Sequence, residues 1–262
     1  MPTTYAHYRF GREVLQTLPE EAQRAVNISL DLFNFGVHGP DLLFYYRPLS
    51  KNHVNRTGYE AHERTGRDFF TEALAAALRS PARGESLTYL YGVLCHFILD
   101  RFCHPYVAEK EKDGVSHSLI ESSFDRYLML RDGLDPITHR VTAHLHPSEH
   151  AAGIIAPYYP ALTTREIYEA QKSMVLHLNL LIAKGPKRLG LATAMNLAGR
   201  PGMLDMFVPY TRDPRCADSD GRLFDCYEEA LRSAPGMFRE LAAAYRGEGE
   251  LGALFDHTFG EN

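Results

Sequence analysis

The sequence predicts an all-α fold in a single domain, for three reasons. Apolar residues recur at helical spacing, strand signals are scarce, and Pro and Gly fall where one helix would give way to the next. With 262 residues, of which 45% are hydrophobic, the chain can bury a sizeable core. We expect a core with the candidate site over about 5–130, and a C-terminal helical region over about 131–262 packing on it.

The first half of the chain divides into five expected helices. Gly11 and the EVLQTL that follows indicate a short first helix, and Pro19 suits the first turn of a second one. Pro105 is expected to close the central helix at His104, because the residue before a proline disfavours helix. The second helix is expected from Pro19 to about Phe35, with Gly39-Pro40 preventing its continuation. The other three are expected, after a polar turn at 50–58, over about Tyr59 to Arg79, Glu85 to Cys103, and Ser116 to about Leu130.

The second half of the chain is expected to hold two long helices separated by less regular segments. Residues 132–160 look irregular because Pro and Gly interrupt them, and residues 200–222 look rich in loops. A long helix is expected from about Thr164 to Lys184, and one interpretation extends it through Leu197. A final amphipathic helix, Phe224 to Tyr245, is expected to kink or break near 235–236, since proline removes a helical hydrogen bond.

Charge, cysteines and end segments exclude several classes of protein. The formal net charge is −5, so the composition does not indicate a basic surface for binding nucleic acid. No Gly-rich phosphate-binding loop of the Walker or dinucleotide kind occurs. The N-terminal segment lacks the features of a secretory signal, and no apolar run is long enough to span a membrane. We therefore expect a cytoplasmic protein. Its four cysteines are expected to be reduced: Cys95, Cys103, Cys216 and Cys226.

Imidazoles and carboxylates at helical spacing mark the stretch 89–125, YLYGVLCHFILDRFCHPYVAEKEKDGVSHSLIESSFD. Residues four apart lie on one face of a helix, so these side chains form two stripes. The first stripe is His96, Asp100 and His104, and the second is His117, Glu121 and Asp125. Buried polar groups need partners, and a divalent metal satisfies several at once. The alternative for any one histidine is a core residue with a hydrogen-bond partner.

Earlier residues could add ligands to this cluster. His7 is either a packing histidine near the terminus or a ligand, and Asp41, after Gly-Pro, is either a helix cap or aimed inward. His62 lies seven residues before Phe69, on nearly the same helical face, so it points to the core. We therefore favour His62 over His53, which lies in the polar turn.

Histidines further along the chain are not expected to form a second site. His139, His144, His146 and His150 lie in the irregular region, where no helical spacing unites them. His177, in an apolar context, is expected to be structural. Cys103 could bind a metal beside His104, but its neighbours do not require this.

Four motifs together resemble the zinc-dependent phospholipase C family, whose fold is shared with single-strand-specific fungal nucleases. The motifs are the Gly-Pro-Asp of 39–41, HFILD of 96–100, HPY of 104–106 and HSLIE of 117–121. The similarity covers roughly residues 5–130. It implies an all-helical fold with three zinc ions in a cleft.

The resemblance also implies a set of ligands. One zinc ion would be held by Asp41, His62, His96 and Asp100, a second by His104, His117 and Glu121, and a third by Asp100 as a bridge with His7. Secreted members complete the third site with the amine and carbonyl of an N-terminal Trp, and this chain has no Trp. Two or three zinc ions per chain are therefore expected.

The expected activity is hydrolysis of a phosphodiester, with phospholipid as the substrate that the resemblance suggests. Zinc ions would make the pocket net positive and attract an anion, and Asp41 could orient or deprotonate the attacking water. One alternative is a nuclease, which would need aromatic stacking platforms beside the metals. Another is a metal-binding helical protein without turnover, which would have a closed site.

Overall fold

The chain folds into packed helices, and the all-α prediction is confirmed. The computed structural model describes residues 4–260, and within that range no β-strand occurs, only an isolated bridge between Thr65 and Thr258. The α-helices are α1 (Thr4–Thr17), α2 (Glu20–Asn27), α3 (Leu30–Gly36), α4 (His53–Glu63), α5 (Gly66–Arg79), α6 (Arg83–Glu111), α7 (His117–Arg131), α8 (Glu149–Ile155), α9 (Thr164–Leu181), α10 (Gly185–Leu197) and α11 (Ser219–Arg246). The short 3-10 helices are η1 (Gly39–Tyr45), η2 (Ala156–Tyr158), η3 (Pro201–Met206), η4 (Pro214–Cys216) and η5 (Ala253–Asp256).

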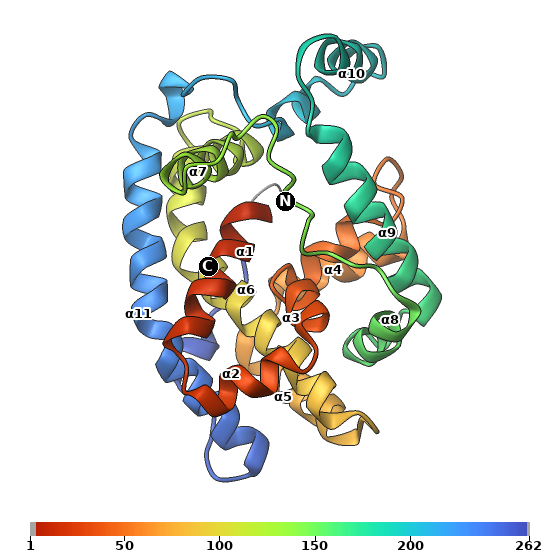
Figure 1. Cartoon of the computed structure of the whole chain (residues 1–262), viewed down its shortest axis with the longest axis vertical. Coiled ribbons are helices and arrows are strands. Elements are labelled where there is room, and N and C mark those ends of the chain that lie inside the picture. The colour runs from red at the N-terminus through yellow and green to blue at the C-terminus, as the bar shows by residue number, and fades with distance from the viewer. Residues whose placement is uncertain (1–3, 261–262) are drawn as a thin grey trace.

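Helix α6 runs through the middle of the molecule, with α1, α3, α5 and α11 packed around it (Figure 1). Every residue from Thr88 to Asp100 is buried. A helix that is covered on all sides needs apolar residues all round, which explains why this stretch lacks a polar face. The histidines and the carboxylate on α6 therefore lie in the interior of the protein.

A pair of glycines lets α3 approach α6 closely. A Cβ atom added to Gly36 would lie 2.4 Å from the Tyr89 carbonyl oxygen, and one added to Gly92 would lie 2.4 Å from that of Phe33. No real Cβ atom tolerates such contacts, so the two helix backbones touch where the glycines meet. This close contact fixes the position of α3 and of η1, which follows it.

The predicted end of the central helix at His104 is wrong. Helix α6 continues through Pro105 to Glu111. A proline inside a helix costs about 3 kcal/mol, but tertiary packing can offset such a cost. The extension buries Val107, and Lys110 forms an ion pair with Asp218 at 2.9 Å.

Two other predicted helices are interrupted. The helix expected from Pro19 to Phe35 breaks at Ser29, whose backbone (φ −142°, ψ 61°) is not helical and whose hydroxyl donates to Glu85. The helix expected from Tyr59 to Arg79 breaks before Thr65, which caps α5 by accepting from the Asp68 amide. The polar turn expected at 50–58 is mostly helical, because α4 begins at His53.

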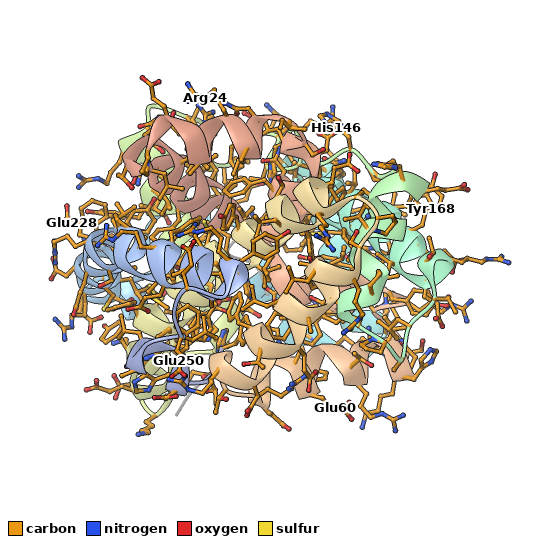
Figure 2. All side chains as sticks on the ribbon, turned by 90° about the horizontal axis from the view of Figure 1, so that it is seen from below. Arg24, Glu60, His146, Tyr168, Glu228 and Glu250 are labelled. Atoms are coloured by element: carbon orange, nitrogen blue, oxygen red, sulfur yellow. The ribbon has the colours of Figure 1, made fainter. Side chains whose placement is uncertain are left out.

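The later elements agree with prediction in part. Residues 132–160 are irregular except for α8 and η2, and the extension of the long helix proves to be the separate helix α10. Helix α11 is not broken, since it is helical across Pro235. Charged side chains such as Arg24, Glu60 and Glu228 lie at the periphery (Figure 2). None of the described helices combines the length and the apolar character needed to cross a membrane.

Candidate metal centre

Five elements bring the eight predicted site residues together. They are His7 from α1, Asp41 from η1, His62 from α4, His96, Asp100 and His104 from α6, and His117 and Glu121 from α7. These side chains make three groups, each with its candidate ligand atoms within 4.8 Å of one another. The groups are His7, His96 and Asp100; Asp41, His62 and His96; and His104, His117 and Glu121.

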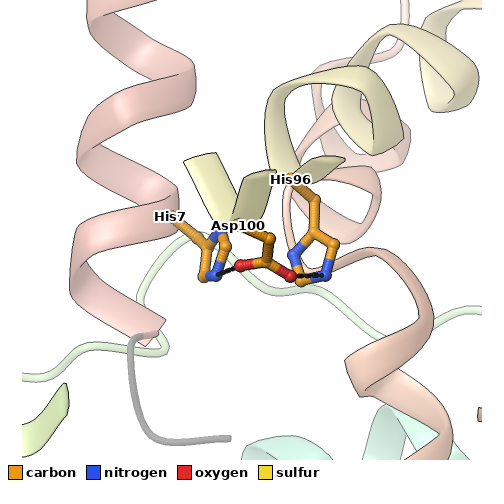
Figure 3. Close-up of side chains that lie close together, drawn as sticks. All are labelled: His7, His96 and Asp100. Atoms are coloured by element: carbon orange, nitrogen blue, oxygen red, sulfur yellow. Dashed lines mark ion pairs between the residues drawn. The ribbon is translucent and has the colours of Figure 1, made fainter. Parts of the chain in front are cut away.

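The Asp100 carboxylate lies at the centre of the first group. Its Oδ1 is 3.2 Å from His7 Nε2, and its Oδ2 is 3.0 Å from His96 Nε2 (Figure 3). The two imidazole rings stack with centroids 4.4 Å apart. Gly39 makes room for them, because its φ of 45° is left-handed and a Cβ atom there would lie 2.5 Å from His96.

The second group lies at the start of η1. His62 Nε2 is 3.1 Å from Asp41 Oδ1, while His62 Nδ1 is 2.7 Å from the Gly58 carbonyl oxygen. A carbonyl can only accept, so Nδ1 carries the proton and the Nε2 lone pair faces the carboxylate side. A backbone contact of this kind orients a metal-binding histidine.

The third group joins α6 to α7. His117 Nε2 is 3.1 Å from Glu121 Oε1, and His104 Nε2 is 3.7 Å from the same oxygen. His104 Nδ1 donates to the Phe259 carbonyl at 3.0 Å, so its Nε2 also faces the carboxylates. Asp100 Oδ1 lies 3.5 Å from His104, which places this group beside the first.

The residues fit a zinc ion by two criteria. Zinc prefers imidazole nitrogen and carboxylate oxygen, which are the donors of all three groups. In addition, His7 Nδ1 and both ring nitrogens of His96 are buried without a well-aligned hydrogen bond among the described residues, although His96 Nε2 lies 3.0 Å from Asp100 Oδ2. Poorly satisfied buried groups are costly, and an ion at His96 Nε2 would lower that cost at a residue that belongs to two groups.

Comparison with known families agrees with this donor set. The family model described as zinc dependent phospholipase C matches residues 6–173. The chain belongs to the zinc-dependent phospholipase C family. That match spans all eight site residues and confirms the resemblance seen in the sequence. Neither the curated proteins nor the solved structures include a match to the chain.

Protons would compete with a metal ion at this candidate centre. Burial would lower the pKa of His104, but Asp100 and Glu121 outweigh it and raise that pKa to about 9. Burial opposes ionisation of Asp100, yet the surrounding imidazoles hold its pKa well below the usual range. Zinc must therefore displace a proton from His104 at neutral pH, so metal loading weakens as the pH falls.

The histidines outside the three groups have other partners. His53 Nε2 lies 2.7 Å from Glu166, and its side chain is half exposed, so His62 rather than His53 faces Asp41. The four histidines of residues 132–160 are separated: His139 contacts the Tyr5 ring, His144 pairs with His38, His146 with Asp31 and His150 with Glu85. His177 Nδ1 contacts the Ser173 carbonyl, as expected for a structural residue.

The roles of two supporting groups, the Asp125 carboxylate and the Phe259 carbonyl, were not predicted from the sequence. Asp125, on the stripe of Glu121, accepts hydrogen bonds from the Tyr5 and Ala6 amides and so anchors the start of α1 beside His7. Burial raises the pKa of Asp125 to about 8. The carbonyl of Phe259 reaches His104 from 155 residues away. The stripe of Asp125 was a usable signal, but no local pattern pointed to Phe259.

Proposed function

We propose that this protein is a zinc-dependent phosphodiester hydrolase of the phospholipase C type, acting on a phospholipid. The observation that carries the proposal is the set of three His and carboxylate groups. Two of them share His96, and Asp100 of the first group lies 3.5 Å from His104 of the third. Membership of the family supports the same reaction class. The products would be diacylglycerol and a phosphorylated head group.

The proposed ligands are the eight side chains of the three groups, holding two or three zinc ions. Asp41, His62 and His96 would hold one ion, and His104, His117 and Glu121 a second. His7 and Asp100, with His96, would hold a third. Asp100 is the carboxylate placed to contribute to more than one group, since it faces His7 and His96 and also lies 3.5 Å from His104 of the third group.

Asp41 is the proposed base. Zinc supplies Lewis-acid polarisation of the phosphoryl group and a lowered pKa for water when it is bound. The Asp41 carboxylate is partly exposed, and Oδ1 faces His62, which leaves Oδ2 to accept a proton from an attacking water. The water oxygen bonds to phosphorus, the bond from phosphorus to the glycerol oxygen breaks, and that oxygen takes up a proton.

Metal analysis followed by a substrate panel tests the proposal. Protein purified without chelator and supplied with zinc should hold at least two zinc ions per chain. It should then hydrolyse a soluble short-chain phosphatidylcholine in preference to single-stranded DNA. Preference for DNA would favour the nuclease alternative, and full zinc occupancy without turnover on any diester would favour a structural centre. Less than one metal ion per chain would reject the centre itself.

A further inference from the structure

Helix α10 is the least covered helix among the described residues. None of its residues is buried, and its main packing partner is the short η3 that follows it. Leu189 is 69% exposed and Leu197 is 85% exposed. Figure 1 shows α10 at one edge of the molecule, away from the body of helices. Exposed apolar groups of this size mark an interaction surface.

The charge around α10 is opposite to that of the rest of the chain. Residues 170–204 contain five cationic side chains and no carboxylate: Lys172, Lys184, Lys187, Arg188 and Arg200. Since the whole chain has a net charge of −5, the rest of it carries −10. Among the residues that the structure describes, none of the five forms an ion pair. Lys187 and Arg200 bond only to backbone carbonyls, so their charges stay uncompensated.

A groove borders this surface, and one of its lining residues contacts the candidate metal centre. It has a volume of about 920 Å³, and its lining includes Leu49, Tyr59, Arg200 and Met203. Phe44 also lines it, and the Phe44 ring stacks on His62 at 5.2 Å between centroids. Arg200 lies just after α10 and donates to the Leu49 carbonyl at 2.8 Å, so the end of α10 borders the groove.

We infer that α10 and its flanking cations form a docking surface for an anionic phospholipid membrane. At 13 residues, α10 is about 20 Å long, too short to span a bilayer but suited to lying in its surface. Its leucines would enter the head-group region while the exposed cations Lys184, Lys187 and Arg200 meet lipid phosphates and carboxylates. With the protein docked in this way, the mouth of the groove would face the membrane. Helix α10 lies beyond the residues that match the family.

Vesicle sedimentation of the full-length protein tests the inference without any catalytic readout. The probes are vesicles of equal parts phosphatidylserine and phosphatidylcholine, and vesicles of phosphatidylcholine alone. The apparent affinity should be about tenfold or more higher for the anionic vesicles, and it should fall as the salt concentration rises above about 0.15 M. Equal binding to both vesicle types, or no binding to either, would overturn the inference.

A double variant and a matched control locate the surface. Leu189→Glu with Leu197→Glu should lower binding to anionic vesicles by about tenfold or more, because it adds two negative charges and removes the apolar contacts. Ile28→Glu is the control, since Ile28 is 75% exposed in the turn between α2 and α3, well away from α10 (Figure 1). Circular dichroism of each variant confirms folding. Equal binding by the double variant and the control would overturn the inference.

The same experiments distinguish membrane docking from self-association of the chain, and from failure of the proposed function. A dimer of the parent chain that the same double substitution dissociates, with no vesicle binding, would make α10 a self-association surface and overturn the inference. Hydrolysis of a soluble short-chain diester requires the metal centre but not a docked membrane. A chain that binds vesicles but hydrolyses no diester would thus keep this inference while rejecting the proposed function.

Discussion

Asp41 combines two features that point to different roles. Burial opposes its ionisation, but the neighbouring imidazoles of His62 and His96 outweigh burial and hold the pKa of Asp41 below its usual range. A carboxylate of low pKa is a good metal ligand and a weak base, because an effective base has a pKa near the working pH. Its partly exposed position still gives it access to water. A neutral amide at this position could still act as a metal ligand but could not act as a base.

Replacement of Asp41 by Asn separates these roles. An amide keeps the size and one ligand oxygen but cannot take a proton, so we expect activity to fall about 10²- to 10⁴-fold while most zinc stays bound. Asp100→Asn is the comparison, because it removes a charge at the point where the groups meet, and zinc occupancy should fall with activity. Zinc content and turnover are measured together. Loss of all zinc from Asp41→Asn would make Asp41 chiefly a ligand; parental turnover would remove it from the mechanism.

The buried pair of His38 and His144 gives the fold a dependence on pH. Their Nε2 atoms lie 2.8 Å apart, so one ring donates to the other and both are neutral. Burial lowers the pKa of both rings, that of His144 to about 3. In the unfolded chain each histidine has a pKa of about 6.5. The contribution of the neutral pair to the unfolding free energy is therefore complete above that pH and is lost as the pH falls toward the lower pKa of the folded state.

We therefore expect His144→Gln to flatten the dependence of stability on pH. Between pH 7.5 and 5, the parent should lose about 2 kcal/mol more unfolding free energy than this variant, because Gln cannot be protonated. Denaturant unfolding in the presence of chelator measures the difference without a contribution from zinc release. His146→Gln is the control, since His146 is exposed beside Asp31. Parallel curves for parent and His144→Gln would contradict the prediction.

The sequence predicted which candidate residues come together better than it predicted how they do so. His62 was placed inward by a helical face shared with Phe69, yet the helix breaks between the two residues. His62 reaches the site because α4 packs against η1. Residues four apart on one helix could be paired from spacing alone, as with His96 and Asp100. Contacts such as His38 with His144 depend on tertiary packing, which a single sequence does not encode locally.

At the scale of elements, the sequence predicted which segments are helical but not where the helices end. Phe69, which the sequence analysis placed on a face that points to the core, is buried. Pro105 was read as an end because local preference favours one, whereas packing of the last turns of α6 on neighbouring helices outweighs that preference. The breaks at Ser29 and Thr65 have weak local signals, since each depends on where the next helix must pack.

The glycine contact between α3 and α6 is testable at this scale. Gly92→Ala would push a Cβ atom against the Phe33 carbonyl, so we expect a loss of about 2 kcal/mol despite the better helix propensity of Ala. Gly84→Ala is the matched control, in the same helix but with open space around its Cβ position. It should leave stability unchanged or raise it by up to about 1 kcal/mol. Equal melting temperatures for the two variants would show that the helices can separate without cost.

At the scale of the whole molecule, the candidate centre joins parts that are distant in sequence. Its ligands come from α1, η1, α4, α6 and α7, and the Phe259 carbonyl adds the C-terminal region through His104. The Phe259 ring is fully buried and packs against Phe69 and Phe97. Ions at this position would add a link between helices that the apolar core already packs together.

Removal of metal should therefore destabilise the whole fold and not only stop the reaction. An ion that binds only the native state adds about 4 kcal/mol when its free concentration is a thousandfold above its Kd, and this corresponds to roughly 10 °C in Tm for a chain of this size. We expect chelator to lower Tm by about that amount, with readdition of zinc restoring it. Asp100→Asn should show a smaller shift, because it holds less metal at the start. An unchanged melting curve for protein shown to be free of metal would mean that buried side chains alone hold these helices together, and that the ions serve only chemistry.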